Sequence, residues 1–459
     1  MIFSVFVFLV EGLLVNLMFQ PNGDTNMNAV AIVFLLINIV VVSLAINFSM
    51  NDDDAKKYKG IIMSSFIVRI LILFWDVYAR GIYILPNSEG DAEYYYSMGV
   101  SYAFGQRADK VELKDYRYYV GQIFKFIGDQ KITVQFLHVF FAICSIILIY
   151  RILTMFEVSE NVKKTTMIFA AFLPNSMMIT TFFLQESFIA FCLVLSLYLY
   201  TKWWFGASAV NFIFAIIFSL IGGLFHMGGT VGAIVYVVFY FLINNKERKL
   251  MITPYRIVLI VIVLFVSLYL LSTYGEDFLG KIGGDMSAES LTKNATGYNT
   301  GGSEYTIGIQ GLPAVLDLIV NTPIRIVYFI CSPMPWRWRS IGDIFAFFSS
   351  ALFYIYTVIV VIKTYANKNT RTVSGKGNIR SYMFILVMLC LVASFMFGWG
   401  VSNSGSALRH REKFTYIFVL LYGIASEITV RAGATNKTTE ENIDNNINIK
   451  SKELSRKMY

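Results

Sequence analysis

Long apolar runs separated by short polar segments dominate the chain. Runs of membrane-spanning length fall near residues 2–20, 29–49, 61–84, 132–152, 165–182, 187–202, 208–224, 230–243, 255–272, 341–362, 381–398 and 413–430. A helix needs about 20 mainly apolar residues to cross a bilayer. A membrane β-barrel needs alternating apolar and polar positions, which runs such as IVLIVIVLFVSLYLL lack. The pattern predicts an all-α polytopic membrane protein with about twelve transmembrane helices.

The composition fits the same class. Of the 459 residues, 56% are hydrophobic and 15% are charged, and the mean hydropathy is +0.60. A soluble domain of this size cannot bury that much apolar surface. Four cysteines lie in or beside apolar runs without CxxC spacing, and the three histidines are scattered, which argues against a disulfide framework or a histidine metal site. The net charge of +8 comes from short loops, so it indicates membrane topology and not nucleic-acid binding.

Basic residues gather in alternate connections between the runs. Lysines and arginines cluster near 56–59, 151–164, 246–249 and 363–380, and again after residue 430. With twelve spans all of these segments face one side, which the positive-inside rule assigns to the cytoplasm. We therefore expect a plasma (inner) membrane protein with both termini cytoplasmic. The polar, Asn-rich segment 431–459 is predicted to be a disordered cytoplasmic tail.

The remaining polar segments fall on the opposite, external face. Two large external loops, 86–131 and 273–340, interrupt the membrane domain 1–430, and LQES, FHMGG and SNSGSALRHRE lie on the same side. None of these segments was used to set the orientation, so their agreement predicts an external active site. The first loop is predicted to hold helices near 92–104 and 116–127. The proline-broken second half of the second loop is predicted to form an interfacial or re-entrant helix.

The first external loop carries candidate catalytic residues in the stretch GDAEYYY. Asp91 and Glu93 could hold a divalent cation or take a proton from a hydroxyl nucleophile. Tyr94 and Tyr95 lie three and four residues from Asp91, so on a helix they share its face and could contact a sugar. The alternative is helix capping, since Ser88 followed three residues later by Asp91 resembles a capping box.

Two further candidates lie at external turns. Glu186 stands between two apolar runs, at the expected tip of a helical hairpin. A charge inside the bilayer is costly without a partner, so Glu186 is either a buried functional acid or a solvated turn residue. His226 in LFHMGG is a candidate sugar contact, or only a histidine at the membrane interface.

Arginines on the external side oppose the usual topological bias. Arg409, His410 and Arg411 form a cluster at the last external boundary, and Arg337 and Arg339 alternate with tryptophans in SPMPWRWR. The arginine fork binds phosphate oxygens in a bidentate manner, which favours a specific diphosphate or phosphate site for the donor. A headgroup anchor, or an aromatic belt in the second case, is the alternative.

Five segments carry a resemblance, in this order: GDAEYYYSMGVSYAFG, QFLHVFFAICSIILIYRI, FLPNSMMITTFFLQESFIAFCLVLSLYLY, SPMPWRW and SGSALRHREKF. The order resembles that of the GT-C superfamily of integral-membrane glycosyltransferases over roughly residues 61–430. The last two segments resemble uncharacterised members from bacterial polysaccharide clusters. The resemblance implies that Asp91 is the catalytic base or metal contact. It also implies that Glu186 helps to bind the metal, Mg or Mn, or the donor phosphate.

The implied activity is sugar transfer from a polyprenyl-phosphate-linked donor to a cell-surface glycan or lipid-linked acceptor on the external face. Arg409 or Arg411 would then stabilise the departing lipid phosphate. An O-antigen-type polysaccharide polymerase remains an alternative that would require repeat-unit donors. A transporter or flippase is a further alternative, although the halves show no internal repeat of the kind that transporters favour. Membrane lipids are expected partners, and nucleic acids are not.

Overall fold

The computed structural model describes residues 27–50, 52–105, 115–129, 131–244, 247–262, 308–309, 311–373 and 377–434. Most of these residues are helical. The strands found among them are the two-residue β1 (Ile243–Asn244) and β2 (Lys249–Leu250), which pair antiparallel. The all-α prediction is confirmed. The predicted tail begins inside the last helix, and its remainder, 435–459, lies outside the described residues.

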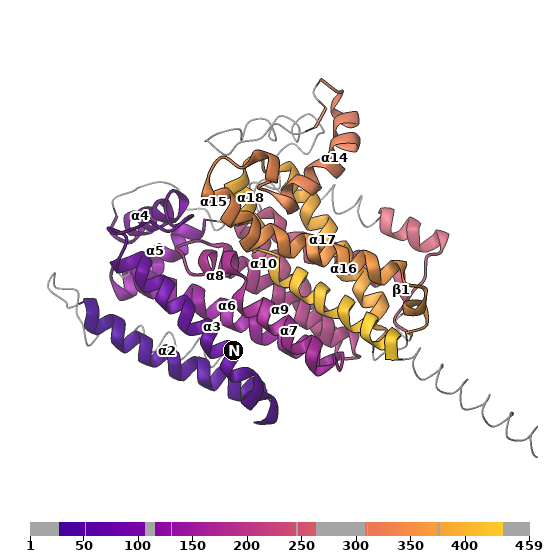
Figure 1. Ribbon diagram of the computed structural model, residues 1–459, viewed down its shortest axis with the longest axis horizontal. Helices are drawn as coiled ribbons and strands as arrows, with labels where there is room; N and C mark the ends of the chain where they lie inside the picture. Colours follow the sequence, from indigo (N-terminus) through magenta and orange to yellow (C-terminus); the bar gives the residue numbers. More distant parts are fainter. Residues whose placement is uncertain are drawn as a thin grey trace, which may run out of the picture.

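The first half of the chain forms a series of helices that cross back and forth (Figure 1). They are α2 (Met27–Ser49), α3 (Asp52–Tyr78), α4 (Asp91–Ala103), α5 (Tyr116–Ile127), α6 (Lys131–Met155), α7 (Glu160–Phe172), α8 (Pro174–Ile179), α9 (Glu186–Trp204), α10 (Ala209–Phe225), η1 (Met227–Thr230) and α11 (Val231–Leu242). The two helices expected in the first loop are therefore present as α4 and α5, within about one residue of their predicted bounds.

The second half packs beside the first. It comprises α14 (Ala314–Cys331), η2 (Pro335–Arg337), α15 (Ile341–Ala346), η3 (Phe347–Ala351), α16 (Leu352–Ala366), η4 (Lys368–Thr372), α17 (Ile379–Trp399), α18 (Ser404–Glu412) and a last helix over Thr415–Ala434. The second half of the second external loop is thus helical, as α14, and this helix contains Pro323. The first half of that loop lies outside the described residues, apart from its last few.

Six helices in the described part of the chain are long and apolar enough to cross a membrane: Lys56–Tyr78, Lys131–Met155, Glu186–Trp204, Ile341–Ala366, Ile379–Trp399 and Thr415–Ala434. Shorter apolar helices cover Leu36–Ser49, Ala209–Phe225 and Met227–Leu242. The described residues thus contain six helices that could span a membrane, and the predicted number of twelve is not shown. The run 2–20 and most of 255–272 lie outside the described residues. The run 165–182 is not one helix, because Pro174 disfavours helical backbone at Leu173, and α7 ends there.

The core lies around α6, which packs against α3, α7 and α9 and is buried along most of its length. In contrast, α3 and α16 keep large apolar side chains on the outside, among them Leu71, 62% exposed, and Ile362, 60% exposed. Exposed apolar faces of this size are costly in water and favourable in a lipid environment. The distribution is that expected for a helical bundle whose outer helices meet lipid.

The hairpin formed by α4 and α5 has no spare room at its crossing. A Cβ placed on Gly99 would lie 2.6 Å from a Val120 methyl, and one on Gly121 would lie 2.7 Å from Tyr102 Cβ. The hairpin rests on the turn between α8 and α9, where Phe183 packs against the hairpin's aromatic rings. This docking fixes the start of α4 close to the start of α9.

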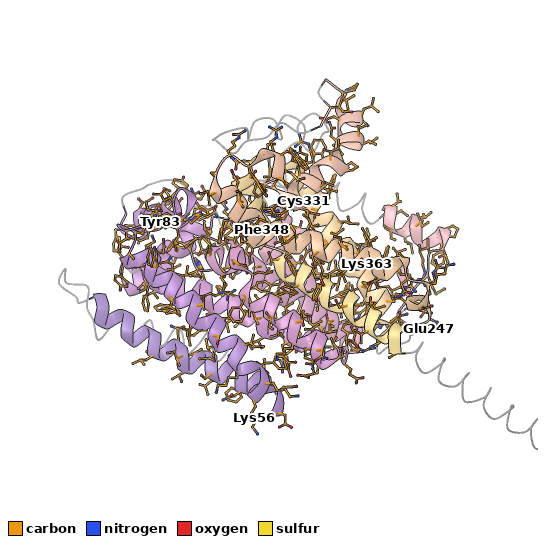
Figure 2. The ribbon with its side chains drawn as sticks, in the orientation of Figure 1. Lys56, Tyr83, Glu247, Cys331, Phe348 and Lys363 are labelled. Atoms are coloured by element: carbon orange, nitrogen blue, oxygen red, sulfur yellow. The ribbon has the colours of Figure 1, made fainter. Side chains whose placement is uncertain are left out.

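The basic connections and the segment before α4 lie in different parts of the bundle. In Figure 2, Tyr83, which precedes α4, lies at the left, Lys56 at the lower edge, and Glu247 and Lys363 toward the right, so the labelled residues of the basic connections lie away from Tyr83. Helices α4, α8, α15 and α18 gather toward the Tyr83 side (Figure 1). The segments that sequence analysis assigned to one face are therefore close together.

Candidate functional site

Four charged side chains from three elements meet at this end of the bundle. Asp91 starts α4, Glu186 starts α9, and Arg409 and Lys413 belong to α18 and the turn after it. The Arg409 guanidinium donates through Nη1 to Asp91 Oδ2 and through Nε to Glu186 Oε1, 2.7 Å away. The Lys413 ammonium lies 3.3 Å from the same Glu186 oxygen. These four residues form the charged cluster.

Burial differs strongly within the charged cluster. The side chains of Glu186 and Lys413 are 0% exposed, whereas that of Arg409 is 16% exposed and that of Asp91 is 54% exposed. Burial lowers the pKa of Arg409 to about 10, so its guanidinium stays charged at neutral pH. Asp91 is therefore the carboxylate that a solute reaches, while the buried Glu186 holds Arg409 and is itself contacted by Lys413.

Both acids stand in the first turn of a helix, where unpaired backbone N–H groups favour negative charge. The N-cap of α4 is Gly90, whose φ of +61° suits a residue without a side chain. No hydrogen bond from a side chain caps this helix start, and the buried Ser88 hydroxyl has no partner among the described residues. The capping-box interpretation of Ser88 and Asp91 is therefore wrong, and Asp91 pairs with Arg409 instead.

Two phenols lie near the buried acid of the charged cluster. Tyr95 and Tyr116 pack edge to face with ring centroids 5.9 Å apart. Burial first, and the charge of Glu186 second, raise the pKa of both phenols well above their usual value. The Tyr116 hydroxyl bonds to His138 Nε2, and His138 Nδ1 lies 2.8 Å from the Phe182 carbonyl oxygen. These contacts keep the phenols protonated, as hydrogen-bond donors near an acid.

Glu93 belongs to a different network from Asp91. Its carboxylate accepts from Arg80 and, at 2.7 Å, from Lys131. Burial acts to raise the pKa of Glu93, but the hydrogen bonds from these two cations outweigh it and hold the pKa below its usual value. Behind them Asp76 lies 4.0 Å from Arg80 and accepts from Gln135 at 2.8 Å. Glu93 therefore anchors α4 to α3 and α6, and Asp91 is the candidate that remains open.

Of the predicted sugar contacts, Tyr94 lies on the exposed side of the site. Tyr94 is 46% exposed, and its hydroxyl accepts from Arg117 Nη1 at 2.7 Å. The guanidinium of Arg117 also lies over the Tyr94 ring and is held by Asp115 through two bonds of 2.6 Å. One face of the Tyr94 ring is thus covered by a cation from α5.

His226 and His410 form an aromatic group beside the charged cluster. Their ring centroids are 4.8 Å apart, and both rings stack on Phe397 of α17. Lys413 connects the two groups, because its ammonium contacts both His410 Nδ1 and Glu186 Oε1. The structure therefore brings His226, from the turn after α10, to the same place as Arg409.

Arg411 faces away from this site. It is 0% exposed, and its guanidinium donates to the carbonyl oxygens of Ile330 and Ser332, the latter at 2.6 Å. It also lies over the Tyr354 ring, 5.4 Å from the centroid. Arg411 therefore ties the end of α14 to α18, and this burial leaves it unsuited to a donor phosphate.

The tryptophan-arginine segment lies beside the start of α15. Trp338 Nε1 donates to the Pro333 carbonyl oxygen at 3.1 Å, and the Arg339 backbone N–H donates to Asp343 at 2.9 Å. Arg337 is the last residue of η2 and contacts neither Asp91 nor any other part of the described charged cluster. The structure does not gather these two arginines with Arg409.

The guanidinium of Arg409 occupies the position between Asp91 and Glu186 that the predicted divalent cation would need. Each acid gives one oxygen to this guanidinium. Mg²⁺ and Mn²⁺ prefer several oxygen ligands around one centre. Within the described ranges no three acidic, histidine or cysteine side chains converge in that way. The arrangement therefore fits an arginine counter-ion better than a metal ion.

Sequence analysis did not select Lys413, Lys131 or Gln135. Lys413 was not selected because it stands at the start of the apolar run 413–430 and resembles a residue at the boundary of a membrane span. Lys131, Gln135 and His138 lie at positions i, i+4 and i+7, so they form a polar stripe on the otherwise apolar α6. That spacing is the signal which could have identified them.

Comparison of the chain with protein-family models, with characterised proteins and with solved structures gives no match.

Proposed function

We propose that the chain is an integral-membrane glycosyltransferase that moves a sugar from a polyprenyl-phosphate-linked donor to a glycan or lipid-linked acceptor. The observation that supports this proposal most is the contact of Arg409 with both Asp91 and Glu186. It places an exposed carboxylate, a guanidinium and a buried acid at the end of a bundle of apolar helices. A lipid-linked substrate presents its phosphate at such a boundary.

Asp91 acts as the general base in this proposal. It takes the proton from the acceptor hydroxyl, whose oxygen bonds to the anomeric carbon of the sugar as the bond from that carbon to the phosphate oxygen breaks. The electron pair of the broken bond remains on the lipid phosphate. Arg409 stabilises the charge that grows there. Because the phosphate competes with Asp91 for Arg409, donor binding also releases the carboxylate that serves as base.

The apolar helices around the site define the proposed topology. The basic connections face the cytoplasm, together with both termini, and the charged cluster faces the outside of the plasma membrane. The separation of Tyr83 from Lys56, Glu247 and Lys363 in Figure 2 supports this topology. Tyr94 and His226 then lie where a sugar would project from the membrane.

The test compares Asp91→Asn with a neighbouring control, Glu89→Gln. Glu89 is an exposed acid just before α4 and lies outside the charged cluster. Transfer of labelled sugar from the lipid-linked sugars of the host is measured in proteoliposomes. Asp91→Asn should lose activity by about 10²–10⁴, the usual effect of removing an acid–base group. Glu89→Gln should behave as wild type. Normal transfer by well-folded Asp91→Asn would contradict the proposal.

A further inference from the structure

Helices α8, α15 and α18 and the turn before α4 line a pocket of about 180 Å³, which we call the ring pocket. Pockets for drug-sized ligands measure about 300–1,000 Å³, whereas an apolar cavity of about 150 Å³ is sufficient for one benzene ring. The size of the ring pocket therefore suits one small ring and not a long ligand.

Polar side chains in the ring pocket keep hydrogen-bonding capacity for a ligand. Asn175, Ser349 and Ser404 line it and are 8%, 6% and 8% exposed. The Asn175 amide nitrogen donates to the Leu408 carbonyl oxygen at 3.3 Å, and its amide oxygen accepts no hydrogen bond within the described ranges. The Ser404 hydroxyl likewise bonds to no other described residue. An amide and a hydroxyl can both donate and accept, which matches the hydroxyl groups of a sugar.

The charge of the ring pocket argues against a phosphate ligand. Among the described residues that line it, Asp343 is charged, and none is a lysine, an arginine or a histidine. Phosphate oxygens bind most strongly to cationic donors, but here they would face a carboxylate. Phe345, which is 53% exposed, and Met178 add apolar surface to the lining. Uncharged polar groups beside an aromatic ring suit a neutral sugar, whose C–H face packs on apolar surface.

The ring pocket adjoins the charged cluster. Gly405 and Leu408 line the pocket, and with Arg409 they lie at positions i, i+3 and i+4, so the three residues share one face of α18. Asn87 also lines the pocket, four residues before the Asp91 that pairs with Arg409. A ring in this pocket therefore lies near the two groups to which the proposed function assigns the acceptor hydroxyl and the donor phosphate.

We propose that the ring pocket binds one uncharged sugar ring of a substrate. This inference rests on the proposed function and adds a saccharide site to it. The ring belongs to the acceptor or to the donor, which share this chemistry, and the kinetic measurements below distinguish the two sources. The donor phosphate stays on Arg409, outside the ring pocket.

Protection of an introduced cysteine tests the inference without turnover. Full-length Ser404→Cys in lipid nanodiscs is treated with methyl methanethiosulfonate, and the reaction is followed by mass spectrometry, with wild type as the background. The probes are glucose, galactose, mannose and N-acetylglucosamine. At about ten times its Kd, at least one of these sugars should slow the reaction about tenfold. The open-chain polyol sorbitol and the charged glucose 6-phosphate should have no effect.

Three outcomes of the protection experiment would overturn the inference. The first is that none of the four sugars protects the cysteine. The second is that sorbitol or glucose 6-phosphate protects it as well as the sugars do. The third is a lack of reaction both in Ser404→Cys and in Ser349→Cys, because a solute then does not reach the pocket.

Variants in the Ser404→Cys background locate the sugar. Asn87 has a φ of +69°, so Asn87→Gly keeps the left-handed backbone and removes the amide. The loss of one or two hydrogen bonds should raise the Kd of the protecting sugar about five- to tenfold. Asn378→Gly is the matched control, because Asn378 has a φ of +48° and lies outside the pocket. Ala346→Leu fills the pocket and should abolish protection. Wild-type affinity in both Asn87→Gly and Ala346→Leu would overturn the inference.

Transfer kinetics identify the source of the ring. Asn87→Gly should raise the KM of one substrate about five- to tenfold. A raised acceptor KM assigns the ring to the acceptor, a raised donor KM assigns it to the donor, and two unchanged KM values would overturn the assignment to a substrate. Sugar protection in a protein that transfers no sugar would refute the glycosyltransferase and leave the ring pocket standing. Transfer without protection by any of the sugars would refute the ring pocket alone.

Discussion

Glu186→Gln should destabilise the protein strongly, and Lys413→Met should reverse most of that loss. Glu186 and Lys413 are both 0% exposed, with the ammonium 3.3 Å from the carboxylate. The glutamine keeps the shape of the side chain but removes its charge. Lys413 is then a buried cation that has lost the carboxylate charge 3.3 Å away.

The expected magnitude follows from this burial. Removing one partner of a buried ion pair costs about 3–5 kcal/mol, a large part of a total folding free energy of about 5–15 kcal/mol. In the double variant the methionine fills the lysine volume without a charge. Arg409 still contacts Asp91 and is partly exposed, so it tolerates the loss of Glu186 better. The coupling free energy between positions 186 and 413 should be about 2–3 kcal/mol.

The assay is unfolding by SDS in mixed micelles for wild type, both single variants and the double variant. The exposed pair Glu247 and Lys249, 3.2 Å apart with side chains 59% and 65% exposed, provides a matched control that should show almost no coupling. Additive losses at positions 186 and 413 would refute the reasoning. They would also revive the interpretation of Glu186 as a metal ligand, since removal of a lysine does not compensate for a lost metal ion.

Three further predictions address neighbouring residues. Arg409→Lys should weaken donor binding about ten- to a hundredfold and leave the stability of the protein unchanged. Arg411→Lys should lower the unfolding temperature, because the Arg411 guanidinium bonds to two carbonyl groups. The donor KM and thermal melts distinguish the two outcomes. Burial raises the pKa of Glu412 from 4.5 to about 7. Between these pH values the folded state holds a proton that the unfolded state releases. The free energy of unfolding that this group contributes is therefore lost as the pH rises from about 4.5 to about 7. Glu412→Gln should reduce the difference in the free energy of unfolding between pH 5 and pH 8. An unchanged difference would contradict the assignment of this pH dependence to Glu412. A membrane-impermeant thiol reagent should label Glu89→Cys in intact cells and Lys368→Cys only after permeabilisation, and the reverse pattern would invert the topology.

Local patterns predicted the first external loop well. The polar residues before α4, the glycine after it and the periodicity of α5 are local signals that were sufficient to predict the bounds of those helices. The grouping of Asp91, Glu186, His226 and Arg409 also followed from the sequence, because alternate basic loops assign each segment to a face. The lengths of the apolar runs and the basic residues in the loops are sufficient to predict this grouping.

Side-chain direction within α18 could not be predicted in the same way. Arg409 and Arg411 look equivalent in the sequence, but two residues on a helix turn by about 200°, so one points to the site and the other into the core. The role of Lys413 depends on α9, which lies more than two hundred residues earlier. Such partners are decided by packing between distant elements, as is the break of the 165–182 run at Pro174.

The crossing of α4 and α5 has a consequence for genetics. Gly99 and Gly121 carry no functional group, and neither has space for even a methyl group. An alanine at either position has to push the two helices apart, and the carboxylate of Asp91 moves with the start of α4. A random screen for inactive alleles should therefore recover these glycines as readily as the acids. Second-site revertants of Gly99→Ala should appear as smaller side chains at Val120, whereas a Cβ at position 121 meets the Cβ of Tyr102, which only glycine at position 102 removes.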